Sequence, residues 1–281
     1  MLTCPVCEQP LARTDSGLRC PHGHSFDRAR AGYVHLATSR QPGDTKAMLL
    51  ARRAFLERGH YAPLAALIER LAVARYTALP AVEPPLAVLD VGCGEGYYVG
   101  GVRRALAAAL PVPPLCFGLD VAKDAARLAA GRHPEVSFVV ADVRARLPFA
   151  SASVGLLLDV FAPRHPAEFA RVVAPGGAAL IVIPAPDHLA ELRAALPLLA
   201  IEAEKDRHIA QRLGDAFILA RTHTLDFALT LAAADLANLL AMTPNAWHAT
   251  SEAAAAAGSL APLAAGAAFR VLEFHRHAEM V

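Results

Sequence analysis

From residue 86 onward, apolar runs alternate with segments of helical periodicity. Runs of roughly four to eight apolar residues predict buried parallel strands, because such strands are covered on both faces. These runs lie at residues 88–91, 115–120, 136–141, 154–161 and 178–184. Between them, apolar positions three and four residues apart predict helices at 97–110, 122–132 and 166–173. The alternation predicts an α/β fold built on a doubly wound parallel sheet.

Further elements flank this alternation on both sides. They are predicted helices at 45–57, 63–76, 188–195 and 231–242 and predicted strands at 225–229 and 269–275. Prolines at both ends of residues 80–85 mark a linker before the first strand of the sheet. We therefore divide the chain into a small module at 1–36, a helical linker region at 37–85 and a main domain at 86–281.

The first predicted strand of the sheet ends in a glycine-rich turn. Asp90 lies within the strand, and Gly92, Gly94 and Gly96 follow it within five positions. Glycines let the chain turn sharply and let a ligand lie against bare main chain. The helix that follows offers free N–H groups and the positive end of its dipole. The turn therefore predicts a ligand site, although its G-x-G-x-G spacing differs from that of dinucleotide folds.

Two further carboxylates end the next two predicted strands. Asp120 is placed to accept hydrogen bonds from ribose hydroxyls, and Asp142 is placed to reach an adenine edge. The glycine turn lacks the lysine–serine pair that holds a triphosphate. The expected ligand is therefore a nucleoside with a charged arm other than a phosphate.

Composition and charge exclude several classes of protein. The 281 residues carry a net charge of +1, so any binding to nucleic acid has to come from a local patch. Uninterrupted apolar stretches long enough for a membrane span and the features of a signal peptide are both lacking. We expect a cytoplasmic protein, in which the five cysteines serve as metal ligands or buried thiols rather than in disulfides.

The N-terminal module has the spacing of a closed zinc site. Cys4 and Cys7 are separated by two residues, Cys20 follows after twelve, and His24 after three more. Four such ligands fill a tetrahedral shell and leave no position for water, which predicts a structural metal. His22 competes with His24 as the fourth ligand, but its spacing from Cys20 fits finger-type geometry less well.

The glycine turn and the two strand-end carboxylates resemble those of class I S-adenosylmethionine-dependent methyltransferases. Over residues 4 to about 250 the chain is similar to the RlmA family, the bacterial large-subunit ribosomal RNA guanine-N1 methyltransferases. The motifs that carry the similarity are Cys-Pro-Val-Cys at 4–7, Cys-Pro-His-Gly-His-Ser-Phe-Asp at 20–27, Pro-Gly-Asp at 42–44, Ala-Arg-Arg-Ala-Phe-Leu at 51–56, Gly-His-Tyr at 59–61, Asp-Val-Gly-Cys-Gly-Glu-Gly-Tyr-Tyr at 90–98, Phe-Ala-Pro at 161–163, Asp-His-Leu at 187–189 and Met-Thr-Pro at 242–244.

This resemblance implies an activity, its cofactors and its partner. The activity is methylation of guanine N1 in a hairpin loop of 23S rRNA, with S-adenosylmethionine as donor and Zn²⁺ in the N-terminal module, which is expected to recognise RNA. Family cofactor contacts fall on Tyr61, Gly94, Glu95 and His188, and relatives suggest a homodimer. The family has two branches that modify neighbouring guanines. The glycine motif resembles the housekeeping branch, which we favour, and Phe-Ala-Pro-Arg at 161–164 resembles the branch linked to macrolide resistance.

Two residues at the end of the fourth predicted strand are candidates for the chemistry. Asp159 is placed to accept the N1 proton, and Phe161 is placed to stack on the base. Asp159 as a purely structural carboxylate is the alternative. Two rival functions also stay open: a class I methyltransferase that acts on a small molecule or another RNA, and a non-catalytic RNA-binding protein.

Overall fold

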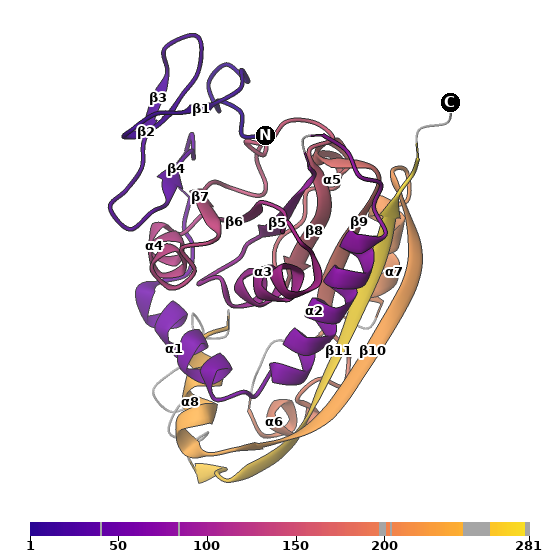
Figure 1. The fold of residues 1–281 in the computed structure, drawn as a ribbon. Coiled ribbons are helices and arrows are strands. Elements are labelled where there is room, and N and C mark those ends of the chain that lie inside the picture. Colours follow the sequence, from indigo (N-terminus) through magenta and orange to yellow (C-terminus); the bar gives the residue numbers. More distant parts are fainter. Residues whose placement is uncertain (40, 84, 197–200, 203, 244–258, 279–281) are drawn as a thin grey trace.

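The computed structural model describes residues 1–39, 41–83, 85–196, 201–202, 204–243 and 259–278 (Figure 1). Pro244, the last residue of the Met-Thr-Pro motif, lies outside them. Across the described chain an eight-stranded sheet carries helices on both faces, and a small three-stranded sheet lies at the N-terminal end. The predicted α/β sheet with a small N-terminal module is thereby confirmed.

The large sheet has the order β10-β11-β9-β8-β5-β6-β7-β4. Its strands are β4 (Val34–His35), β5 (Ala87–Val91), β6 (Cys116–Asp120), β7 (Ser137–Val140), β8 (Val154–Val160), β9 (Val173–Pro184), β10 (Phe217–Leu231) and β11 (Leu263–Arg276). The six strands from β4 to β9 pair in parallel. β11 runs antiparallel to β9, and β10 runs antiparallel to β11. The parallel pairing predicted for the five alternating strands is therefore confirmed, and β11 and β10 add an antiparallel edge whose direction the sequence did not predict.

The length of β10 was also missed, because only residues 225–229 were expected to form a strand. The strand begins at Phe217 and pairs with β11 as far as Leu231. Polar residues such as Arg221 and His223 occupy its N-terminal half, and most of its side chains are exposed or half-buried. An edge strand with a solvated face needs no continuous apolar run, so its pattern resembles a charged loop.

Eight helices connect or cover the described strands. They are α1 (Lys46–Glu57), α2 (Ala62–Thr77), α3 (Tyr97–Ala109), α4 (Lys123–Arg132), α5 (Pro166–Val172), α6 (Ala190–Ala195), α7 (Lys205–Leu213) and α8 (Ala233–Ala241). Local signals explain several helix starts: the Thr45 side chain accepts a hydrogen bond from the Met48 amide, and α5 begins with a proline. α7 was not predicted, because its mean hydropathy is low and only Ile209 and Leu213 are buried.

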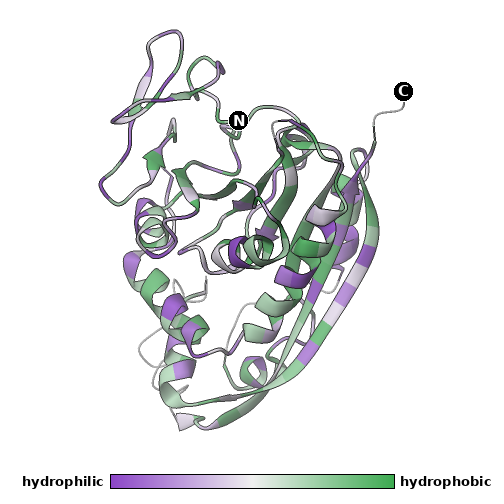
Figure 2. Cartoon of the chain, viewed as in Figure 1, coloured by the Kyte–Doolittle hydropathy of each residue, from purple (hydrophilic) through white to green (hydrophobic). Residues whose placement is uncertain are grey.

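Two hydrophobic cores lie on opposite faces of the sheet. Successive residues along a strand point to opposite faces, so Leu156 and Leu158 join one core and Leu157 joins the other. Helices α2, α3 and α4 cover the first face, and α5 and α7 cover the second. Hydrophobic colouring follows the inner strands in Figure 2. Burial on both faces leaves only the strand ends open, where ligands bind in open α/β sheets.

The N-terminal module forms its own sheet and is attached to the main domain at two places. β1 (Ala12–Arg13), β2 (Gly17–Arg19) and β3 (Ser25–Asp27) make this sheet. After it, β4 pairs with β7 of the large sheet. At the other attachment, the Thr3 amide donates to the Pro148 carbonyl over 3.0 Å, and the Ala150 amide donates to the Met1 carbonyl over 2.8 Å.

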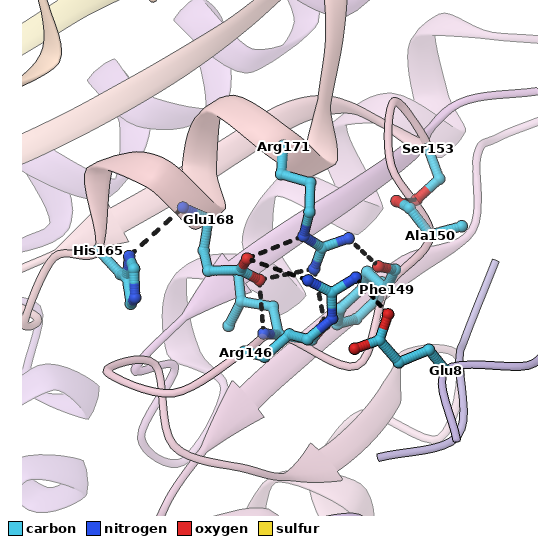
Figure 3. A network of polar contacts seen from close by, with 9 residues as sticks. Glu8, Arg146, Phe149, Ala150, Ser153, His165, Glu168 and Arg171 are labelled. Carbon is cyan, nitrogen blue, oxygen red and sulfur yellow. Dashed lines mark hydrogen bonds and ion pairs between the residues drawn. The ribbon is translucent and has the colours of Figure 1, made fainter. Parts of the chain in front are cut away.

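A buried ion pair holds the segment at 147–150 to which the N-terminus binds (Figure 3). Arg171 of α5 pairs with Glu168 at 2.6 Å and donates to the carbonyls of Phe149 and Leu147. Glu168 in turn accepts a hydrogen bond from the Leu147 amide at 2.7 Å. At the surface, Arg146 continues the network to Glu8, which follows the ligand Cys7.

Breaking the Arg171–Glu168 ion pair is expected to destabilise the protein strongly. Burial opposes ionisation of Glu168, but hydrogen bonds from Arg171 and Leu147 outweigh it, so the pKa of Glu168 is lowered. Replacement of Arg171 by alanine is expected to lower the free energy of unfolding by about 3 kcal/mol, because an uncompensated buried charge remains. Urea titration measures this change.

The expected pH dependence follows from the lowered pKa of Glu168. The ion pair contributes its full stability above the ordinary pKa of a glutamate, and this contribution is lost as the pH falls through the folded-state pKa. In the control, Arg127→Ala removes the exposed pair with Asp124 in helix α4 and should change stability by at most about 0.5 kcal/mol. Equal losses in the two variants would contradict the assignment.

Candidate cofactor and metal sites

The four predicted metal ligands come together in the N-terminal module. One ligand atom from each of Cys4, Cys7, Cys20 and His24 lies within 4.8 Å of all the others. The Cys7 and Cys20 sulfurs are 3.6 Å apart, and His24 Nδ1 is 3.4 Å from the Cys20 sulfur and 3.5 Å from the Cys4 sulfur. A tetrahedral zinc with bonds of about 2.0–2.3 Å places its ligand atoms roughly 3.5–3.8 Å apart. The arrangement therefore fits zinc with His24 as the fourth ligand.

The glycine turn has a backbone that other residues adopt only with strain. Gly92, Gly94 and Gly96 have φ angles of 69°, 54° and 83°. A Cβ on Gly92 would lie 2.5 Å from the Cβ of Ala162, in the loop that follows β8. Because Gly92 has no side chain, the turn can pack closely against Ala162. The main chain of the turn is then accessible to a ligand at the start of α3.

Asp120 and Asp142 follow the ends of adjacent strands, as expected. The carboxylate of Asp120 accepts hydrogen bonds from the amides of Gly94 and Ala122, at 2.9 Å and 2.8 Å. Asp142 accepts one from the Arg144 amide at 2.9 Å. A carboxylate offers about four lone-pair sites, so Asp120 retains capacity for ribose hydroxyls. Burial raises the pKa of Asp120, although the two amides oppose this effect.

Asp90 and Asp159 are buried carboxyl groups at the ends of the neighbouring strands β5 and β8, on opposite faces of the sheet. Both side chains are almost wholly inaccessible, and Asp159 is aligned with Val91 in the parallel ladder. Neither oxygen of Asp90 has a hydrogen-bond partner among the described residues, and neither does Oδ2 of Asp159. Buried polar atoms without partners are rare in native proteins and indicate a bound ligand or water. The free oxygens of Asp90 therefore fit the positively charged arm of the expected cofactor, and Oδ2 of Asp159 stays available to take up a proton.

Burial raises the pKa of both carboxyl groups. Burial, followed by repulsion from Asp159 and Asp120, raises the pKa of Asp90 well above its ordinary value. Burial also raises the pKa of Asp159, but only to about 7, because Arg164 lies beside it. Arg164 Nη2 is 3.3 Å from Oδ1 of Asp159. Asp159 can therefore exchange a proton near neutral pH, as a general base requires.

Tyr61 and His188 are hydrogen-bonded to each other, although 127 positions separate them in the sequence. His188 Nδ1 accepts from the Ala268 amide at 3.1 Å, so its proton lies on Nε2, 3.2 Å from the Tyr61 oxygen. Burial lowers the pKa of His188 to about 4, and the ring is neutral at pH 7. With His188 as donor, the Tyr61 hydroxyl is free to donate its own proton to a ligand.

Phe161 projects from the loop after β8 and has the exposure expected of a stacking residue. Its side chain is 44% exposed, and its φ angle of 58° is unusual for a residue with a Cβ. Such strained positions cluster at functional sites. Its ring lies 5.7 Å from that of Phe269, which also contacts His188 and Tyr61. Sequence reasoning missed Phe269, because its contacts exist only after β11 has paired.

Glu95 lies beside the turn but already has protein partners. Its Oε2 accepts from Arg53 Nε at 3.0 Å and from Arg132 Nη1 at 3.2 Å. Oε1 is buried and has no hydrogen-bond partner among the described residues. Burial raises the pKa of Glu95 against the effect of both arginines. A cofactor contact through Oε1 or through the Glu95 backbone stays a prediction.

The linker helix α1 packs against α8, and we call this pair the helical cover. Arg58 follows α1 and forms an ion pair with Asp235 in the first turn of α8, and His60 Nε2 lies 3.0 Å from the same carboxylate. At the other end of α8, Arg52 donates to the Met242 carbonyl at 2.9 Å. The cover joins two segments about 190 positions apart, so local sequence patterns contain no signal for it.

A cavity of about 690 Å³ opens beside the Asp120 loop. One wall is formed by His35, residues 37–39 and residues 41–44, and the start of α4 with Val121 and Ala122 forms the other. The first wall lies between β4 and α1 in the sequence, so residues before the main domain help to enclose the ligand edge of the sheet.

Comparison with known proteins finds relatives of both the N-terminal module and the main domain. A family model described as "RlmA, N-terminal", a zinc ribbon, matches residues 2–39, and a model described as a methyltransferase domain matches residues 88–177. A Micromonospora griseorubida protein, provisionally assigned as a 23S rRNA (guanine-N(1)-)-methyltransferase, is 44% identical over 88% of this chain and 87% of its own length. The chain belongs to the RlmA family. A second relative is the 23S rRNA (guanine(748)-N(1))-methyltransferase of Streptomyces fradiae, 41% identical over 88% of this chain and 86% of its own length.

Membership in the RlmA family confirms the two predicted cofactors, S-adenosylmethionine in the main domain and zinc at Cys4, Cys7, Cys20 and His24. The fold has distant relatives as well. A solved structure from work on the conversion of a disulfide bond into a thioacetal group in echinomycin biosynthesis superposes with a TM-score of 0.50 at 14% identity, covering 75% of this chain and 82% of that one. Among the described helices, none has the length and apolarity needed to cross a membrane.

Gly92 gives a direct test of the cofactor turn in this RlmA-family chain. Gly92→Ala should weaken S-adenosylmethionine binding by roughly 100-fold, because the Cβ collides with Ala162 and the positive φ is strained. Calorimetry measures the affinity. Gly131→Ala is the matched control, since its Cβ would meet nothing within 4 Å in helix α4. Its affinity should be unchanged and its helix slightly more stable. Wild-type affinity in Gly92→Ala would refute the placement.

Proposed function

We propose that this chain methylates N1 of a guanine in a hairpin loop of 23S rRNA with S-adenosylmethionine as donor. The observation that carries the proposal is the joint presence of a complete zinc ribbon and a methyltransferase turn on one chain. Both relatives named above have this activity in their names. A methyltransferase for small molecules has no evident need for the ribbon, and a non-catalytic RNA-binding protein has no evident need for the orphaned carboxylates of Asp90 and Asp159.

The residues at the strand ends support a proton-transfer mechanism. When bound, S-adenosylmethionine would supply a methyl group already activated as a sulfonium substituent and would leave as the neutral thioether once its S–CH3 bond is broken. Guanine N1 carries a proton, which Asp159 accepts through its free Oδ2 as the new N1–carbon bond forms. Phe161 stacks on the flipped base and orients N1, because its ring projects from the adjacent loop. Asp159 releases the proton to water after product departure, so the group is regenerated.

The two guanines that the family modifies differ only in position within the hairpin. The Streptomyces fradiae relative acts on guanine 748 by its name, and this chain is 41% identical to it over 249 aligned residues. The Phe-Ala-Pro-Arg stretch at 161–164 supports the same branch. We therefore propose the position equivalent to guanine 748, and give this evidence more weight than the glycine motif that favoured the other branch.

Methylation of a short transcript tests this function. Purified, zinc-loaded protein is incubated with labelled S-adenosylmethionine and an unmodified transcript of the hairpin, and reverse transcription maps N1-methylguanine as a stop. We expect one stop, which disappears when that guanine is replaced by adenine. Transfer in the absence of RNA would support the small-molecule rival. RNA binding without transfer, unaffected by S-adenosylmethionine, would support the non-catalytic rival.

Two further expectations belong to this proposal. The reaction takes place in the cytoplasm, where ribosomal RNA is the partner, and the active species is a homodimer. Analytical ultracentrifugation of the protein with and without the hairpin transcript tests the second point. A single species with the mass of one chain under both conditions would overturn it.

A further inference from the structure

Arg52 belongs to helix α1 of the helical cover, and its side chain reaches the glycine turn. Its Nη2 makes an ion pair with Asp44 at 2.6 Å and donates to the Met242 carbonyl at 2.9 Å. Its Nη1 lies 3.2 Å from the point where a Cβ of Gly94 would be, and among the described residues Nη1 has no hydrogen-bond partner. The Arg52 guanidinium thus lies beside the main chain of the glycine turn, and its Nη1 can still donate hydrogen bonds to a ligand.

The orientation of the cofactor follows from the order of the strands. The ribose belongs at Asp120 after β6 and the adenine toward Asp142 after β7, so the amino-acid arm extends the other way, toward β5 and β8. Asp90 lies there and suits its ammonium group. The same arm ends in a carboxylate, which an acid would repel. It therefore needs a cation or hydroxyl donors from other elements.

Tyr98 provides a second unused donor at this place. It lies in the first turn of α3, and its hydroxyl is buried without a partner among the described residues. Tyr61, Arg52 and Asp90 are close enough for their charges to act on this hydroxyl. A buried hydroxyl without a partner is destabilising unless a ligand accepts its hydrogen bond.

We propose that Arg52 and Tyr98 bind the carboxylate of the amino-acid arm of S-adenosylmethionine. The guanidinium supplies charge through Nη1, and the phenol supplies one hydrogen bond. Because Arg52 also holds Asp44 and the end of α8, the bound cofactor fixes the helical cover in place. The inference concerns cofactor binding alone, so it stands or falls independently of the RNA target.

Calorimetry with two ligands tests the assignment. The probes are S-adenosylmethionine and its decarboxylated analogue, which keeps the sulfonium and the amine. Arg52→Gln should bind S-adenosylmethionine at least about 10-fold more weakly than wild type does, the usual effect of losing a charge-assisted hydrogen bond. It should bind the analogue with wild-type affinity. Tyr98→Phe should show the same selective loss at about 3- to 10-fold, and it removes no contact within the protein.

Two matched controls separate ligand contact from support of the cover. Arg58→Gln removes a contact at the opposite end of α8, at Asp235, without touching the turn. Tyr97→Phe removes the neighbouring hydroxyl of α3. Both should keep wild-type affinity for each ligand. Equal loss of both ligands in Arg52→Gln, or equal losses in Arg52→Gln and Arg58→Gln, would overturn the role of Arg52, and unchanged binding in Tyr98→Phe would overturn that of Tyr98.

Discussion

Asp159→Asn is expected to lower the turnover number for guanine methylation by about 100-fold or more, the usual contribution of a general base. Asparagine has the same shape and keeps an oxygen for the Ala162 amide and Arg164, but it cannot take up the N1 proton. The affinity for S-adenosylmethionine should stay within about threefold, because the contacts to the nucleoside lie on β6 and β7. Single-turnover kinetics and calorimetry measure the two quantities separately.

The pH profile gives this prediction its sharpest form. The pKa of Asp159 is raised to about 7 by burial, and a base acts only when it has lost its proton. Wild-type turnover should therefore fall about tenfold per pH unit below pH 7 and level off above it. The variant should show no such dependence. Equal wild-type rates at pH 6 and pH 8, or full turnover in Asp159→Asn, would remove Asp159 from the reaction.

Cys20→Ser is expected to abolish methylation of RNA while leaving the binding of S-adenosylmethionine intact. The N-terminal module has short strands and few buried apolar residues, so the metal supplies most of its stability, on the order of 10 kcal/mol in isolated zinc modules. Serine is a far weaker zinc ligand than thiolate. The glycine turn lies in the main domain, which has its own hydrophobic cores. Elemental analysis, calorimetry and transcript methylation measure the three properties.

His22→Ala is the matched control for the metal site. His22 is exposed and is not among the four clustered ligands, so the variant should retain one zinc and full activity. Two results would contradict the prediction: retention of zinc in Cys20→Ser, or RNA methylation at the wild-type rate by a variant that has lost its zinc.

The parts of the structure that the sequence predicted well are those determined by neighbouring residues. The turn at Gly92–Gly96 requires positive φ angles that glycine supplies, and β5 is apolar because helices cover both faces of the sheet. The zinc site likewise depends on two short pairs of ligands, each held in its own tight turn. In both cases the chemical signal and the backbone geometry lie within a few positions of each other.

The parts that were missed depend on contacts between distant segments. β10 is a strand because β11 pairs with it, and its own exposed polar residues give no such signal. Arg52 reaches Met242 across 190 positions, and Phe269 joins Tyr61 across the sheet edge. The roles of Asp159, Phe161 and Asp142 stay predictions, since burial and orphaned oxygens show need for a partner but not its identity.

The two attachments of the zinc ribbon have a consequence for substrate choice. β4 pairs with β7 in the large sheet, and residues 1–3 form backbone hydrogen bonds with residues 148–150. The ribbon is therefore held in a fixed orientation relative to the main domain. The distance between the metal site and Asp159 is therefore fixed by the fold. If the ribbon binds RNA, as the family resemblance implies, only a base at that distance can reach Asp159. We therefore expect a hairpin with a nucleotide added or removed between the two points to place the wrong base at the site.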